Sequence, residues 1–143
     1  MGRLRRFWAL APPDRRLFFR ALGGLVLVRA GLWVLPFGRV RRAAARASRR
    51  GAGSSPPGFD ERVAWAVASS ARFVPAATCL TRALTARVLL ARGGCDAALR
   101  LGVAHEGERL RAHAWVEREG RVLLGGEHDL SAFTVLPPIE GEA

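Results

Sequence analysis

Two stretches decide the fold and the chemistry of this chain: PAATCLTRAL at residues 75–84 and AHAWVE at residues 112–117. In the first, Cys79 lies at the start of a helical pattern that follows Pro75. In the second, polar and apolar residues alternate as in a strand, and His113 comes 34 positions after Cys79. A nucleophilic thiol needs a base, and an imidazole on a rigid strand is a usual partner. The pair therefore indicates a Cys/His hydrolase or acyl-transfer enzyme.

The residues around these stretches predict a small α+β domain. Apolar spacing predicts a helix from Asp60 to Phe73, and another from Cys79 to the Gly93-Gly94 pair. The second helix is expected to have one apolar face, made by Leu80, Leu84, Val88 and Leu89.

Three strand-like runs follow these helices, at residues 98–104, 110–118 and 121–124. Glu119-Gly120 fits a two-residue hairpin turn between the last two runs. Two helices followed by antiparallel strands indicate the α+β class.

The net charge of +11 divides unevenly along the chain. Residues 1–50 hold 13 Arg and one Asp, for a charge of +12, whereas residues 51–143 hold 10 Arg and 11 acidic residues, for a charge of −1. The positive charge is interleaved with apolar residues rather than with polar or stacking ones, which disfavours a nucleic-acid partner.

The two cysteines, Cys79 and Cys95, do not make a disulfide framework or a zinc motif. They favour a reduced, cytosolic setting, and we expect neither a metal nor a cofactor. Cys95 follows Gly93-Gly94 in a loop and is expected to be structural. The apolar run from Phe7 to Pro12 is too short for a signal peptide.

The N-terminal segment, residues 1–50, is expected to be helical, apolar and basic. Pro12-Pro13-Asp14 predicts a helix start, with Asp14 as a cap, and Gly23-Gly24 predicts a break into two shorter helices. Arg20 and Arg29 interrupt the apolar run on opposite faces, and an Arg in the middle of a bilayer costs about 3 kcal/mol.

A helical hairpin or a surface helix therefore fits this segment better than a span does, with flanking arginines at positions 39, 41, 42, 46, 49 and 50. Three roles stay open for this segment: covering residues 51–143 or a partner, contacting a membrane surface, and spanning a membrane. Residues 51–58 have the composition of a linker, which makes residues 59–143 a separate domain.

A helix start favours a thiolate at Cys79, and first-turn amides can donate to an oxyanion. A third group should orient His113. The hairpin register places Gly126 opposite His113, so a bulge at Gly125-Gly126 is needed to bring in an acid. Asp129 is the favoured acid and Glu127 is its alternative.

Purely structural or solvated roles also stay open for these side chains. Cys79 fits a buried core cysteine, and a lone strand His is often structural or solvated. Trp115 is expected in the core or in a pocket wall, His105 in the solvated acidic turn 105–108, and His128 in a loop.

Several motifs together resemble one family, the transglutaminase-like leader peptidases of lasso-peptide biosynthesis, which form the C-terminal part of the B protein and are separate chains in split gene clusters. The resemblance covers residues 59–136 and extends to the Arg-rich front with Leu35-Pro36-Phe37. The motifs are TCLTRAL (78–84), LLARGG (89–94), LRLGV (99–103), AHAWVE (112–117), GRVL (120–123) and Gly125-Gly126.

This resemblance implies a papain-like, transglutaminase-type core with catalytic residues in the order Cys, His, Asp. It implies removal of the leader from a ribosomally made precursor, which frees the amine that a separate ATP-dependent synthetase closes into a macrolactam. It also implies a small leader-binding protein as partner, for which this chain has no room. Cys79 and His113 match the family pattern directly, whereas the acid does not.

We therefore expect a cysteine peptidase in which Cys79 attacks, His113 is base and then acid, and Asp129 or Glu127 holds the ring. Two alternatives remain: an acyltransferase of the same fold, and a non-catalytic docking protein for a membrane or a complex, with a degenerate enzyme-like half.

Overall fold

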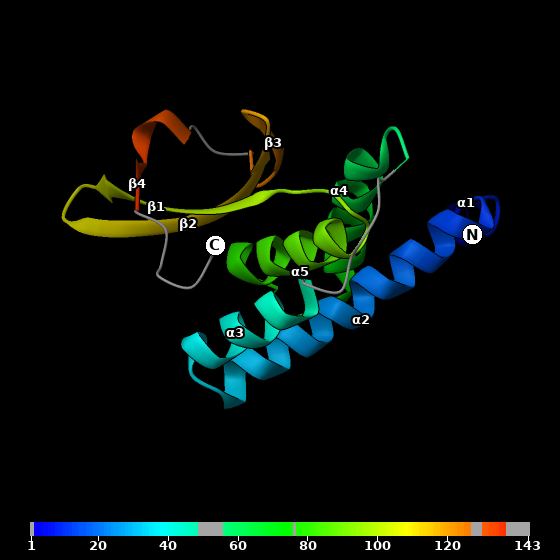
Figure 1. The fold of residues 1–143 in the computed structure, drawn as a ribbon, viewed down its shortest axis with the longest axis horizontal. Coiled ribbons are helices and arrows are strands. Elements are labelled where there is room, and N and C mark those ends of the chain that lie inside the picture. The colour runs from blue at the N-terminus through cyan, green and yellow to red at the C-terminus, as the bar shows by residue number, and fades with distance from the viewer. Residues whose placement is uncertain (1, 49–55, 76, 127–129, 137–143) are drawn as a thin grey trace.

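The computed structural model describes residues 2–48, 56–75, 77–126 and 130–136. It contains a group of helices packed on one side of a small curved sheet (Figure 1), which confirms the predicted α+β class. The helices are α1 (Gly2–Trp8), α2 (Pro12–Val34), α3 (Phe37–Ser48), α4 (Phe59–Ser70), η1 (Ala71–Phe73), α5 (Cys79–Arg92) and η2 (Leu130–Ala132). The strands are β1 (Ala98–Glu106), β2 (Arg109–Arg118), β3 (Arg121–Leu124) and β4 (Thr134–Val135).

The sheet has the order β3-β2-β1-β4, with all neighbours antiparallel. The predicted hairpin is confirmed: Arg118 pairs with Arg121, and Glu119 and Gly120 both have positive φ, at 53° and 77°. This is the turn geometry whose twist matches that of paired strands. The short strand β4, which the sequence analysis did not predict, pairs with β1 through Val103 and Thr134.

The turn between β1 and β2 is shorter than predicted. His105 lies in β1, paired with Leu110, and only Gly107 and Glu108 form the turn. Gly107 takes a φ of 66°, which suits a tight connection and lets both strands continue further. His105 is exposed, in agreement with the expectation that it is solvated.

Helix α5 is central to the core. It begins where Thr78 caps it, because the Thr78 hydroxyl accepts a hydrogen bond from the Thr81 amide at 3.3 Å. It ends before Gly93-Gly94, as predicted.

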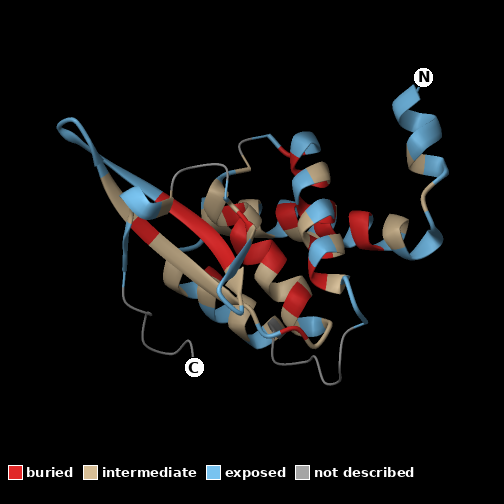
Figure 2. Cartoon of the chain, turned by 90° about the horizontal axis from the view of Figure 1, so that it is seen from above, coloured by how far each residue is buried: buried red, intermediate tan, exposed pale blue. Residues whose placement is uncertain are grey.

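The buried surface of α5 extends beyond its predicted apolar face. Leu84 is buried and Leu80 and Leu89 pack against the core, but residues on other faces are also buried: Thr81, Ala83, Thr85, Ala86 and Leu90. The reason is that α2, α3, α4 and β2 all contact this helix. Figure 2 shows buried segments along the middle of the sheet and the adjoining helices, whereas α1 is largely exposed.

The N-terminal helices contribute to this core. Leu17, Ala21 and Leu25 of α2 are buried in the same cluster as Val63 and Val67 of α4. The inner face of α2 therefore covers part of the fold formed by residues 51–143, which was one of the three roles left open for the N-terminal segment. Residues 51–55 of the predicted linker lie outside the described residues, and the proposed division at residues 51–58 stays a prediction.

Helix α2 is continuous, so the predicted break at Gly23-Gly24 is wrong. A Cβ on Gly24 would lie 2.9 Å from Cγ2 of Thr85, which shows that this glycine lets α2 approach α5 closely. The chain turns instead at Leu35, whose extended backbone (φ −114°, ψ 151°) is the conformation that a following proline favours.

Asp14 does not cap α2. The helix begins at Pro12 with Ala11 as its N-cap residue, and no side chain bonds to that end. The Asp14 carboxylate accepts a hydrogen bond from Nε of Arg62 at 2.7 Å, which ties the start of α2 to α4. A guanidinium is a stronger partner for a carboxylate than a neutral amide is, which accounts for the difference.

The close approach of α2 to α5 generates a paired prediction. Gly24→Val should lower the free energy of unfolding by about 1–3 kcal/mol, because the new side chain overlaps Thr85. Gly23→Val is the matched control, since a Cβ there meets nothing within 4 Å, and it should change stability by no more than about 0.5 kcal/mol. Urea denaturation followed by circular dichroism measures both, and equal effects at the two positions would contradict this packing.

Candidate active site

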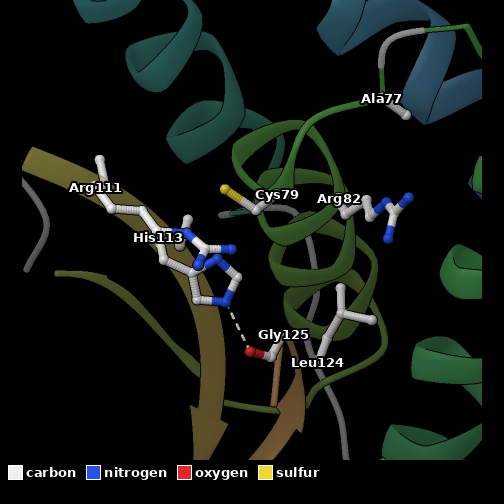
Figure 3. A pocket seen from close by; sticks show the side chains of 9 residues that line it. Ala77, Cys79, Arg82, Arg111, His113, Leu124 and Gly125 are labelled. Atoms are coloured by element: carbon white, nitrogen blue, oxygen red, sulfur yellow. Dashed lines mark hydrogen bonds between the residues drawn. The ribbon is translucent and has the colours of Figure 1, made fainter. Parts of the chain in front are cut away.

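A pocket of about 410 Å³ opens between the start of α5, strand β2 and the end of β3. Figure 3 shows Cys79 and His113 on its walls, from the helix and the strand respectively. The two residues that the sequence analysis paired are thus brought to one site. The pocket is lined by Ala77, Cys79, Arg82, Arg111, Ala112, His113, Ala114, Leu124 and Gly125.

Cys79 is the first residue of α5 and is partly buried. Its sulfur points toward the strand that carries His113 (Figure 3). The Thr78 cap occupies the Thr81 amide, so the amides of Cys79 and Leu80 belong to the first-turn donors that an α-helix does not bond internally. Together with the helix dipole, these donors favour negative charge at this end of α5.

His113 lies in β2 and is only 6% exposed. Its Nε2 is 2.7 Å from the backbone oxygen of Gly125 (Figure 3, dashed line). A carbonyl oxygen only accepts hydrogen bonds, so Nε2 must be the donor, and the neutral ring then carries its lone pair on Nδ1. The ring is further held by Trp115, stacked at 6.0 Å between centroids, and by Phe133 at 5.6 Å.

The Gly125 carbonyl reaches His113 because of a backbone conformation that suits glycine. Gly125 has a φ of 91°, and a Cβ there would lie 2.8 Å from Cβ of Trp115 and 2.9 Å from the oxygen of Ala114. A side chain would therefore be strained by the dihedral angle and would collide with the backbone of β2. Sequence reasoning missed this group because a backbone carbonyl has no side-chain signature; the signal was the glycine pair that follows β3.

Comparison with protein families adds to this geometry. Residues 24–137 match the model of the transglutaminase-like superfamily, which is most of the chain. The chain belongs to this superfamily. Searches of curated proteins and of solved structures gave no significant match.

Membership in the transglutaminase-like superfamily confirms the predicted fold class, and members are commonly cysteine peptidases or acyltransferases. The matched region begins inside α2, so it includes most of the helical hairpin as well as the domain expected at residues 59–143.

The third group of the transglutaminase-like site stays a prediction, because Glu127, His128 and Asp129 lie outside the described residues. The pairing register expected for β2 and β3 beyond their turn is wrong, however. The irregularity between β2 and β3 falls before Leu124, which pairs with Val116, while Val122 pairs with Glu117. Leu123 is thereby bulged, and both Leu123 and Leu124 pack into the core, which alternation along a regular strand would not allow.

Two arginines line the pocket beside the predicted catalytic pair. Nε of Arg82 is buried and has no hydrogen-bond partner among the described residues. Nη1 of Arg111 lies 3.8 Å from the Glu106 carboxylate. Both guanidinium groups can donate to carbonyl or carboxylate oxygens of a bound peptide.

The remaining candidates lie away from the pocket lining. Cys95 is 1% exposed, and Arg118 Nη1 lies 3.3 Å from its sulfur. Trp115 is buried, as expected, and its indole N–H donates to Glu117 at 2.7 Å. Among the described residues, no group of His, Cys, Asp and Glu side chains is arranged to hold a metal ion.

The Gly125–His113 hydrogen bond gives a second paired prediction. Gly125→Ala should slow alkylation of Cys79 by iodoacetamide at pH 7 by about tenfold, the effect of ~1.4 kcal/mol, because a displaced imidazole is no longer in place to take the thiol proton. Gly126→Ala is the control: its Cβ would meet only Cγ1 of Val122, at 3.3 Å, and Cβ of Val122, at 3.9 Å. Peptide mass mapping gives the rate at Cys79, and equal rates in the two variants would show that the carbonyl does not position the ring.

Proposed function

We propose that this protein is a cysteine peptidase that removes the leader from a lasso-peptide precursor before macrolactam formation. The observation that carries the proposal is the convergence of Cys79, at the capped start of α5, and His113, with its Nε2 tied to Gly125, in one open pocket. Superfamily membership supports the cysteine peptidase or acyltransferase class. The finer assignment comes from the motif resemblance in residues 59–136.

In the proposed reaction, Nδ1 of His113 takes the proton of the Cys79 thiol, and the sulfur attacks the scissile carbonyl. The first-turn amides of α5 stabilise the negative oxygen of the tetrahedral intermediate. As the C–N bond breaks, His113 returns the proton to the leaving amine, so the core peptide departs with a free N-terminus. The leader stays on Cys79 as a thioester, which water hydrolyses with His113 again as base.

The Gly125 carbonyl has a defined part in this sequence. It accepts a hydrogen bond from the Nε2–H of His113, which favours the neutral tautomer that has its lone pair on Nδ1. When His113 becomes an imidazolium, the same carbonyl dipole stabilises the charge. Asp129, with Glu127 as the alternative, remains the proposed acid that completes a triad.

The proposed partners follow from the family resemblance. They are the precursor peptide, a small leader-binding protein that delivers it, and the synthetase that consumes the freed amine. Arg82 and Arg111 are suited to hold the peptide backbone or its acidic side chains beside Cys79.

An acyltransferase is the second candidate, because the superfamily includes such enzymes and their chemistry shares the first half of the reaction. The acyl-enzyme on Cys79 would then be resolved by an amine instead of water. The two candidates differ in the product: a leader with a free carboxylate, or a leader joined to an amine.

Substitution of the two cysteines tests the proposal. Cys79→Ala should reduce cleavage of a precursor peptide, supplied with its leader-binding protein, by at least about a thousandfold, because the nucleophile is lost. Cys95→Ala, which removes a buried thiol outside the pocket, should retain cleavage. Mass spectrometry of the products measures both, with circular dichroism to confirm that each variant is folded.

Cleavage by folded Cys79→Ala at the wild-type rate would remove Cys79 from the mechanism. A leader joined to an amine, in place of a leader acid, would support the acyltransferase.

A further inference from the structure

The outer face of α2 carries an exposed apolar stripe. Exposed residues recur along this face at helical spacing, and the C-terminal end is the most open: Leu27 is 74% exposed, Trp33 82% and Val34 80%. We call this surface the outer stripe, made by Phe19, Gly23, Val26, Leu27, Ala30, Trp33 and Val34. An exposed apolar surface of this length is uncommon on a soluble monomer and marks a binding surface.

Positive charge surrounds the outer stripe. Arg16 and Arg20 are exposed at its N-terminal end, and the Arg29 guanidinium lies over the Trp33 ring, 5.5 Å from the centroid. The neighbouring helix α3, which packs beside α2 (Figure 1), presents a row of exposed arginines at positions 39, 42 and 46. The sequence has no acidic residue between Asp14 and Asp60.

We propose that the α2–α3 hairpin docks on an anionic lipid bilayer, with α2 lying in the plane of the interface. The outer stripe enters the boundary between headgroups and acyl chains, and the arginines bind lipid phosphates. An apolar helix face with tryptophan, flanked by many cations and no acids, has the chemistry of an interfacial helix. The charge favours a bilayer over an uncharged partner surface, because every titratable residue between positions 15 and 59 is an arginine.

Docking on the surface fits the fold better than crossing the bilayer does. By length and composition alone α2 is able to span a membrane, with 23 residues and a mean hydropathy of 1.6 in its best window. However, its inner face is committed to the core, since Leu17, Ala21 and Leu25 pack with α4 and α5. Surrounding α2 with lipid would take these residues out of the core. Arg20, which lies beside Phe19 on the exposed side, suits the headgroup region and not the bilayer centre.

This inference is independent of the proposed peptidase activity, because no residue of the pocket takes part in it. It also gives the outer face of α2 a role separate from that of its inner face.

Co-flotation of the full-length protein with vesicles tests the inference. Vesicles of equal parts phosphatidylcholine and phosphatidylglycerol should bind at least about tenfold more tightly than phosphatidylcholine alone, and binding should weaken as NaCl rises from about 0.1 M to about 0.5 M. The double variant Leu27→Gln/Trp33→Gln should lose at least about tenfold in vesicle affinity, since it removes much of the apolar contact. The triple variant Arg39→Gln/Arg42→Gln/Arg46→Gln should lose the preference for phosphatidylglycerol.

Leu110→Gln is the matched control. Leu110 is 67% exposed near the turn between β1 and β2, and it lies outside the α2–α3 hairpin. It should bind vesicles as the wild type does. The inference is overturned if the wild type does not float with anionic vesicles, or if Leu110→Gln weakens flotation as much as the α2 variant does. It is also overturned if the outer stripe instead binds the leader-binding protein or a second copy of this chain, with no lipid binding.

Discussion

The burial of α5 on several sides is the constraint on which the rest of the structure depends. Helices α2, α3 and α4 and strand β2 all contact it, and even its threonines are buried, with the Thr85 hydroxyl donating to the Thr81 carbonyl at 2.8 Å. A helix held in this way cannot shift along its axis without opening the core. Its first turn, and with it Cys79, is therefore fixed relative to β2, so the site draws its rigidity from the N-terminal helices as well as from the sheet.

The second half of the site depends on a backbone group. His113 is oriented by the Gly125 carbonyl, and Gly125 is placed there by the bulge that lets Leu123 and Leu124 both enter the core. Core packing and ring orientation are thus coupled through three consecutive residues. A neutral carbonyl fixes the tautomer without adding a buried charge.

The features that the sequence predicted correctly are local ones. Glu119-Gly120 encodes its own turn, Gly93-Gly94 ends the helix that Cys79 begins, and Cys79 and His113 lie on elements that short-range signals define. The errors arise where a distant residue decides: α2 packs closely on Thr85 at Gly24, Asp14 binds Arg62 of α4, and Leu123 packs into the core out of strand alternation. None of these partners is visible from the segment itself, and the Gly125 carbonyl carries no residue-type signal at all.

The proposed peptidase reaction requires Cys79 to carry the leader as a thioester while His113 transfers the proton. The most direct measurement is hydroxylamine trapping during turnover of a precursor peptide, followed by mass spectrometry of the leader fragment. Hydroxylamine attacks a thioester and releases a leader hydroxamate, so the account predicts that hydroxamate replaces the free leader acid in proportion to the hydroxylamine concentration. Cleavage that yields only the leader acid at every hydroxylamine concentration would contradict a covalent intermediate on Cys79.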